Sequence, residues 1–332
     1  MTDKLKIAVV GMGKMGIVHS CILNVIPDVE LAALCEKSSL TRRILKKVFQ
    51  NVAIVDDVAK MVDFNLDAIY VTTPILSHCG VIKAVCKENV ARNLFVEKTL
   101  AANPEEAKEL CQLTNNSGGI NMVGYLRRFY VTFKKAKDLL LEEAVGQVSS
   151  FNAFAYSSDF LGLETDMTAA RGGVLRDLGC HAIDLALWFF GNLEVYLAQP
   201  ASESDRVDDS VNFKVKGQNG LDGEFSVSWR TEGYRMPEVG FLIVGSKGTI
   251  AVNDDKVELV LQNGRKFAWY RHDLDDNVPF WLALPEYYRE DEIFVKSVRD
   301  SVTVEPNFVS GSKVDEIISQ VEKKAGEQDT PK

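Results

Sequence analysis

Short apolar runs alternate with amphipathic segments over the first 123 residues. In the amphipathic segments, such as 77–87 and 104–113, apolar residues recur at i, i+3 and i+4, which is typical of helices with one buried face. The apolar runs predict buried strands at residues 5–10, 30–34, 67–71, 93–96 and 120–123. This alternation predicts a doubly wound parallel sheet with helices on both faces, the α/β arrangement of a Rossmann domain.

The pattern changes after Val123. A helix is expected at 132–143, and the stretches 211–215, 225–229 and 257–261 then alternate apolar and polar residues. Strict alternation is typical of antiparallel strands with one covered face. Turn sequences at 218–220 and 263–264 suit hairpins. We therefore place the boundary between two parts, 1–123 and 124–332, near Gly124.

Charge and cysteine content narrow the class of protein. The 332 residues include 38 Lys and Arg against 47 Asp and Glu, a net charge of −9, which disfavours nucleic-acid partners and anionic membrane surfaces. The six cysteines form no C-x-x-C pair, which favours reduced thiols over disulfides. No apolar stretch reaches the ~20 residues that a membrane span needs. We expect a cytoplasmic protein without nucleic-acid or membrane partners.

A glycine-rich turn follows the first predicted strand and opens a helix. In Gly11-Met12-Gly13-Lys14-Met15-Gly16 the first glycine permits a tight turn, the second admits a pyrophosphate, and the third allows close helix–strand packing. Glu36 lies twenty residues beyond Gly16, where a ribose-binding carboxylate belongs. A glycine-rich turn without a ligand is the alternative. Strand, helix and acid together predict dinucleotide binding at Gly11, Gly13, Lys14, Met15, Gly16 and Glu36.

The nucleotide is expected to be NAD, because the Glu36 carboxylate would repel a 2′-phosphate. NADP stays open, since Lys37, Arg42 or Arg43 could hold that phosphate. Further along the chain, Thr73, Pro74 and His78 follow a predicted strand. His78 could line the nicotinamide end of the site or cap its helix.

Glu97, Lys98 and Thr99 follow the predicted strand at 93–96. Ligands of doubly wound sheets bind beyond the carboxyl ends of the strands, so Glu97 and Lys98 are expected beside the cofactor. An ammonium group there could donate to a substrate oxygen. A solvated surface lysine is the alternative.

Asp177 and His181 are four residues apart, so on a helix they share one face, which Asp184 continues. A carboxylate beside an imidazole can form a general acid/base near neutral pH. Alternatively, Asp177 caps the helix, or His181 binds a metal with Asp177, Asp184 or Cys180. Because the chain has only four histidines, we expect no metal site.

Two residues at the start of the second part complete the candidates. Tyr125 and Arg128 follow the last predicted strand of the first part. Arg128 could contact a substrate hydroxyl or carboxylate, or it could form a salt bridge between the two domains.

The order and spacing of these motifs over almost the whole chain resemble the Gfo/Idh/MocA oxidoreductases. The resemblance is carried by Gly11–Gly16, Thr73-Pro74 with His78, Glu97-Lys98, Val123-Gly124-Tyr125 with Arg128-Phe129, Gly172–Asp184 with Trp188 and Gly191, and Gly245–Thr249. It implies a dinucleotide-binding domain at 1–123 and, at 124–332, a substrate-binding and oligomerisation domain with an open-faced, mostly antiparallel sheet. Homodimers or homotetramers are implied as well.

The same resemblance implies hydride transfer between NAD(P) and a secondary alcohol carbon of a sugar, sugar derivative or polyol. Lys98 matches the family's active-site lysine, and Asp177 and His181 match its substrate-binding and proton-transfer pair. Some relatives retain NAD and catalyse a hydrolysis or elimination without net redox change. That reaction and a non-catalytic, dinucleotide-binding regulator are the alternatives.

Thr99 is a departure from the family pattern, which has a proline after the lysine. Where the family's Lys-Pro bond is cis, a threonine makes the cis isomer several kcal/mol less favourable. The sequence therefore disfavours a cis bond after Lys98.

Overall fold

The computed structural model describes residues 4–159, 161, 172–200, 209–279, 282 and 284–328. The chain forms two compact units, one of Met1–Tyr125 with Trp281–Asp315 and the other of Leu126–Phe280 with Glu316–Lys332. The chain first passes from one unit to the other between Tyr125 and Leu126, close to the boundary predicted near Gly124. The segment 281–315 belongs to the first unit, whereas the sequence pattern groups it with everything after residue 123.

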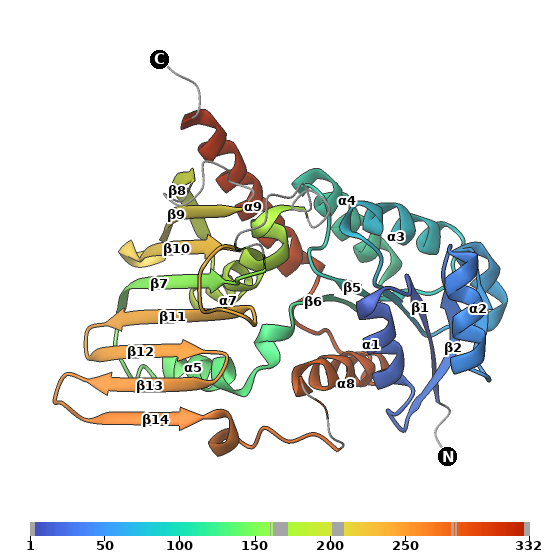
Figure 1. Ribbon diagram of the computed structural model, residues 1–332, viewed down its shortest axis with the longest axis horizontal. Helices are drawn as coiled ribbons and strands as arrows, with labels where there is room; N and C mark the ends of the chain where they lie inside the picture. The colour runs from blue at the N-terminus through green and yellow to red at the C-terminus, as the bar shows by residue number, and fades with distance from the viewer. Residues whose placement is uncertain are drawn as a thin grey trace. The chain divides into compact units, whose positions relative to one another are not determined.

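The first unit contains a six-stranded parallel sheet with the strand order of a Rossmann fold (Figure 1). Along the sheet the strands are β3 (Ala53–Val55), β2 (Val29–Cys35), β1 (Leu5–Val10), β4 (Ala68–Val71), β5 (Asn93–Glu97) and β6 (Asn121–Gly124). The five strands named from apolar runs are confirmed. The sixth, β3, has only three half-buried residues, too few to form a recognisable run.

Helices complete the first unit. They are α1 (Lys14–Leu23), α2 (Ser39–Val48), α3 (His78–Lys87), α4 (Pro104–Ser117), α8 (Pro285–Asp300) and the start of α9 (Phe308–Gln328), with 3₁₀ turns at Val58–Phe64 and Ile75–Ser77. The Asn103 side chain caps α4 by accepting the Glu106 N–H at 2.9 Å.

Backbone hydrogen bonds explain why the late segment joins the first unit. The Val123 N–H donates to the Pro306 carbonyl, and the Phe308 N–H donates to the Asn121 side chain, both at 2.8 Å. Residues 306–308 therefore lie beside β6, and α8 packs against α1. These contacts join residues more than 180 positions apart in the sequence, so no local sequence pattern predicts them.

The second unit is built on an eight-stranded sheet. Its strands in spatial order are β14 (Lys266–Tyr270), β13 (Lys256–Leu261), β12 (Gly248–Asn253), β11 (Glu238–Gly245), β7 (Val148–Tyr156), β10 (Asp222–Ser228), β9 (Ser210–Gly217) and β8 (Leu193–Pro200). Neighbouring strands are antiparallel except for the parallel pair β7–β10. The predicted, mostly antiparallel sheet is confirmed.

Helices α5 (Val131–Leu141) and α7 (Cys180–Phe190) cover one face of this sheet (Figure 1). Short helical segments lie at Leu126–Phe129, Leu175–Gly179, Gln218–Gly220 and Arg271–Leu274. On β7 the residues Phe151, Ala153 and Ala155 are buried, whereas the alternating Asn152 is exposed. This alternation fits a sheet with one covered and one open face.

Candidate functional site

The glycine-rich turn has the geometry that its sequence predicts. Gly11 has φ +95°, and a Cβ there would lie 2.6 Å from Thr73 Cγ2, so only glycine fits. A Cβ on Gly16 would overlap the Gly11 carbonyl oxygen, which confirms close helix–strand packing at the third glycine. At Gly13 a Cβ would meet nothing within 4 Å. The second glycine therefore faces open space, as the approach of a pyrophosphate requires.

The N-terminus of α1 faces the same open space. Within the described part of the chain, no side chain caps this helix. Its first-turn N–H groups and positive dipole end are suited to a phosphate anion. Lys14 is exposed and Met15 half-buried in this first turn.

A cavity of about 410 Å³ opens beside this turn. Five of the predicted cofactor residues line it, namely Gly11, Glu36, Lys37, Thr73 and Pro74. Thr73 Oγ1 is buried and has no hydrogen-bond partner among the described residues. An unsatisfied buried hydroxyl is costly, and a polar ligand in the cavity would satisfy it. The residues present therefore fit a dinucleotide.

The Glu36 carboxylate lies at the end of β2 and is held by two backbone N–H groups. Oε2 accepts from Met12 at 3.0 Å, and Oε1 accepts from Ser38 at 2.8 Å. These bonds fix the carboxylate on the lining of the cavity, where it can accept hydrogen bonds from a ribose diol.

Charge around Glu36 distinguishes the two nucleotides. Asp56 and Asp57, which the sequence analysis did not single out, also line the cavity. The Arg42 guanidinium donates to the backbone carbonyls of Glu36 and Lys37, at 2.8 and 2.6 Å. The lining of the cavity thus contains three carboxylates and one lysine, Lys37. This excess of negative charge disfavours the 2′-phosphate of NADP and favours NAD.

The segment Glu97-Lys98-Thr99 ends β5 and is largely enclosed. Glu97 and Thr99 are buried, and Lys98 is half-buried. Glu97 Oε2 accepts the Lys98 N–H at 3.0 Å. The Lys98–Thr99 peptide bond is cis. The sequence analysis disfavours a cis bond at this position, and that prediction is wrong.

His78 does not line the cavity and is completely buried. Its Nε2 lies 2.8 Å from the Thr73 carbonyl oxygen, and its Nδ1 lies 3.0 Å from that of Thr99. Burial lowers the pKa of His78 despite these contacts, which favours the neutral ring. As a neutral ring, His78 donates to only one of these carbonyls, and its side chain lies between the end of β4 and the segment after Lys98.

The second unit holds the other predicted acid/base residues. Asp177 lies in a short π-helical segment, Leu175–Gly179, and His181 lies in the first turn of α7. His181 is buried and Asp177 is half-buried. The residue at the N-cap of α7 is Gly179, so Asp177 does not cap this helix. Single π turns inside helices are frequent at functional sites.

Arg128 forms a salt bridge, but with a partner inside the second unit rather than across the two domains as the alternative proposed. Its Nε and Nη2 donate to both Asp184 carboxylate oxygens at 2.8 and 2.7 Å. Its guanidinium also lies 5.8 Å from the centre of the Trp188 ring. Tyr125, at the end of the first unit, is completely buried. Arg128 is buried too, so neither side chain is exposed to solvent.

Two family models match this chain. Residues 5–125 match the oxidoreductase family with an NAD-binding Rossmann fold, and residues 133–251 match the GFO/IDH/MocA C-terminal domain. The first match ends at residue 125 and the second begins at residue 133.

Several curated proteins are similar over most of the chain. The myo-inositol 2-dehydrogenase of Thermotoga maritima is 25% identical over 322 residues, which cover 92% of this chain and 91% of the relative. The NAD(+)-dependent scyllo-inositol 2-dehydrogenase of Bacillus subtilis is 26% identical, with coverage of 76% and 75%. Among solved structures, a levoglucosan dehydrogenase in complex with NADH and L-sorbose has a TM-score of 0.87 at 19% identity and 98% coverage of both chains. That likeness supports the same fold.

Proposed function

Because this chain belongs to the Gfo/Idh/MocA family of NAD-binding oxidoreductases, we propose that it transfers hydride between NAD and a secondary alcohol carbon of a sugar, sugar derivative or polyol. The observation that carries the proposal is the cavity beside the glycine-rich turn, with Glu36 held in place to accept from a ribose. Relatives named as inositol dehydrogenases, similar over most of the chain, support this substrate class.

NAD, when bound, supplies the hydride acceptor. In the proposal, the Lys98 ammonium donates a hydrogen bond to the substrate oxygen that loses its proton, which stabilises negative charge there. The His181 imidazole accepts that proton as general base. Asp177 binds a substrate hydroxyl and orients the imidazole. Cofactor contacts come from Gly11, Gly13, Lys14, Met15, Gly16, Glu36, Lys37, Thr73 and Pro74.

A panel of sugars, inositols and nucleotide sugars tests the proposal, with NAD and NADP as acceptors and absorbance of the reduced nicotinamide as readout. Reduction of NAD by at least one polyol is the expected result. Substrate conversion without accumulation of reduced nicotinamide would instead indicate an NAD-retaining hydrolase or lyase. Dinucleotide binding without any conversion would favour a non-catalytic regulator.

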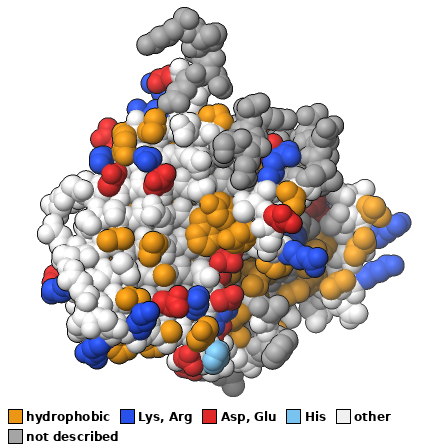
Figure 2. Space-filling model, turned by 60° about the vertical axis from the view of Figure 1, so that its left-hand side comes forward, with side chains coloured by type: hydrophobic (Ala, Val, Ile, Leu, Met, Phe, Trp, Pro, Cys, Tyr) orange, Lys and Arg blue, Asp and Glu red, His pale blue; other side chains and the backbone are white. Residues whose placement is uncertain are grey.

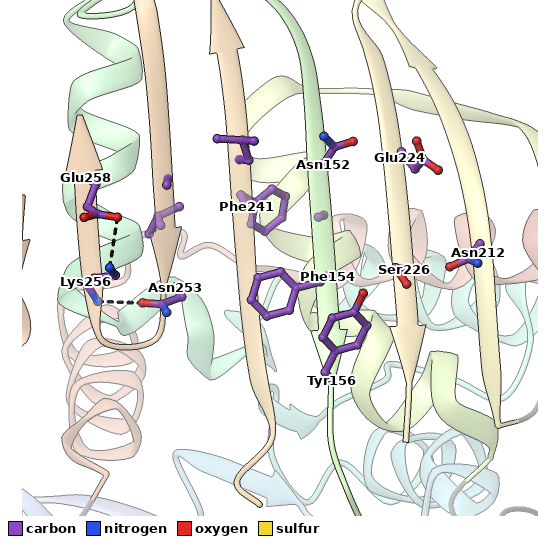
Figure 3. A pocket seen from close by; sticks show the side chains of 14 residues that line it. Asn152, Phe154, Tyr156, Asn212, Glu224, Ser226, Phe241, Asn253, Lys256 and Glu258 are labelled. Atoms are coloured by element: carbon purple, nitrogen blue, oxygen red, sulfur yellow. Dashed lines mark hydrogen bonds and ion pairs between the residues drawn. The ribbon is translucent and has the colours of Figure 1, made fainter. Parts of the chain in front are cut away.

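The open face of the second unit's sheet supports a proposal about assembly. Side chains of β7 and β9–β13 surround a hollow of about 670 Å³, in which Phe154 and Tyr156 project beside polar groups such as Asn152 and Ser226 (Figure 3). We propose that this face pairs with that of a second copy in a homodimer or homotetramer. Light scattering after size-exclusion chromatography tests the pairing, and the Tyr156→Glu variant should shift the mass toward the monomer.

The cellular compartment is a further proposal. Each of the six cysteines is a free thiol, which supports a reducing, cytoplasmic location. In the described residues, no helix is long and apolar enough to cross a membrane. On the face shown in Figure 2, basic, acidic and hydrophobic side chains are interspersed. Fractionation of cells that express the protein tests its location.

A further inference from the structure

A buried histidine connects two carboxylates in the interior of the first unit. His19, on α1, is completely buried, and its Nδ1 lies 2.8 Å from Asp291 Oδ1. Its Nε2 lies 3.1 Å from Glu97 Oε1. Asp291, on α8, is completely buried as well. Neither His19 nor Asp291 belongs to the cofactor motif or to the acid/base residues that the sequence analysis names.

The charges of the three groups are complementary. Burial by itself lowers the pKa of His19, but Asp291 and Glu97 together raise it well above its ordinary value. Burial by itself raises the pKa of Glu97, but the hydrogen bond and charge of His19 bring it below its ordinary value. The raised pKa and the two flanking carboxylates favour the imidazolium form of His19, which can donate through both nitrogens at once.

Aromatic packing holds the imidazole ring in one orientation. Its centre lies 5.4 Å from the ring centre of Tyr70, 5.0 Å from that of Phe95 and 5.9 Å from that of Tyr287. Because packing restricts ring rotation, Nε2 keeps facing Glu97.

The network ends at the backbone of Lys98. While Glu97 Oε1 faces His19, Glu97 Oε2 accepts the Lys98 N–H at 3.0 Å. His78 contacts the carbonyl of Thr99 on the other side of Lys98. The residue proposed to contact substrate is thus fixed at its own N–H by a network that begins on α8, 193 residues further along the chain.

We propose that Asp291 and His19 are positioning residues for Lys98, acting through Glu97. Burying charged groups incurs a desolvation penalty that apolar side chains of similar volume avoid, so the network is weak evidence for stability. We infer that the network orients Lys98. Orientation matters for the rate, because displacement of a catalytic group by about 1 Å can lower it by about 100-fold. The inference rests on the proposed function in so far as Lys98 is the group that contacts substrate.

The test is Asp291→Asn in the full chain, which keeps the side-chain shape and removes the charge. The matched control is Asp300→Asn, the same change at an exposed position of the same helix. We expect Asp291→Asn to lower kcat about 10- to 100-fold, with the Kd for NADH changed less than about twofold because the cavity residues are untouched. Asp300→Asn should change neither quantity.

A second readout does not depend on activity. Hydrogen exchange at the Lys98 amide, followed by NMR, should be about tenfold faster or more in Asp291→Asn, with β1 amides unchanged. Unchanged exchange at Lys98, or equal acceleration throughout the first unit, would overturn the positioning role. If no substrate is found in the panel, the proposed function fails while the exchange result still decides this inference.

Should Asp291→Asn not fold, His19→Asn replaces it, since that change removes the imidazole nitrogen that contacts Glu97. Faster exchange confined to the Lys98 segment would then support the proposal. Wild-type exchange and wild-type kcat together would overturn it.

Discussion

The Arg128 guanidinium forms a two-point salt bridge with the Asp184 carboxylate, with N–O distances of 2.8 and 2.7 Å and both side chains more than 90% buried. Asp184 lies on α7, three residues after His181. The salt bridge therefore connects the segment after β6 with α7, the helix that carries His181. Its role in the structure is to hold that helix in place.

Breaking this pair should destabilise the protein strongly. Asp184→Asn removes the carboxylate charge that contacts the buried Arg128 guanidinium at two points, so we expect a loss of about 3–5 kcal/mol in the free energy of unfolding. Urea denaturation measures it. The exposed pair Lys216–Asp222 offers a matched control, because Asp222→Asn should cost less than about 1 kcal/mol. Equal losses in the two variants would contradict the structural role of the buried pair.

The three glycines of the cofactor turn should separate folding from binding. A methyl group at Gly16 overlaps the Gly11 carbonyl oxygen, so Gly16→Ala should lower Tm by several degrees or prevent folding. A methyl group at Gly13 meets no protein atom within 4 Å, so Gly13→Ala should keep Tm and weaken NADH binding. Calorimetry and fluorescence titration with NADH measure the two effects. A Gly13→Ala protein that binds NADH like the wild type would argue against a pyrophosphate at that position.

Nucleotide preference should depend on more than Glu36. Loss of hydrogen bonds to a charged group is worth about 1.5–3 kcal/mol, so Glu36→Ala should raise the Kd for NAD about 10- to 100-fold. NADP should still bind poorly, because Asp56 and Asp57 remain in the cavity. Only combination with Asp56→Ser should improve NADP binding. Isothermal titration of each variant with both nucleotides checks the order, and the exposed Asp63→Asn is the control.

The proposed acid/base residues should affect turnover more than cofactor affinity. We expect Lys98→Ala and His181→Ala each to lower kcat by about 100-fold or more, in the range typical of general acid–base groups. The Kd for NADH should stay within a few-fold of the wild type. Stopped-flow kinetics with the identified substrate, paired with NADH titrations, separates the two quantities. Wild-type turnover in either variant would remove that residue from the mechanism.

The His19 network should make stability depend on pH. Because the folded pKa of His19 is raised, its contribution is fully present below its unfolded pKa of about 6.5 and is lost as pH rises through the folded value. The free energy of unfolding should therefore decline from near neutral pH upward, and His19→Asn should lack that part of the decline. Chemical denaturation at a series of pH values measures both slopes. Parallel curves for the two proteins would contradict an imidazolium at His19.

The fold and the cofactor motif followed from local patterns. Burial on both faces makes five of the six parallel strands continuous apolar runs. The glycine spacing belongs to one short turn, so Gly11, Gly13 and Gly16 could be assigned roles from sequence. Glu36 could be identified from the sequence for the same reason, since β1, α1 and β2 form one short βαβ unit. The family resemblance rested on the same local motifs.

Tertiary structure decided the contacts between distant segments. Nothing near Asp291 in the sequence indicates that it meets His19, because the two are 272 residues apart and joined only when α8 packs on α1. The same holds for Arg128 with Asp184 and for residues 306–308 beside β6. The residue type alone sets the shape of a side chain and the charge that it can carry. Its partner, its burial and hence its pKa depend on which distant residues folding brings next to it.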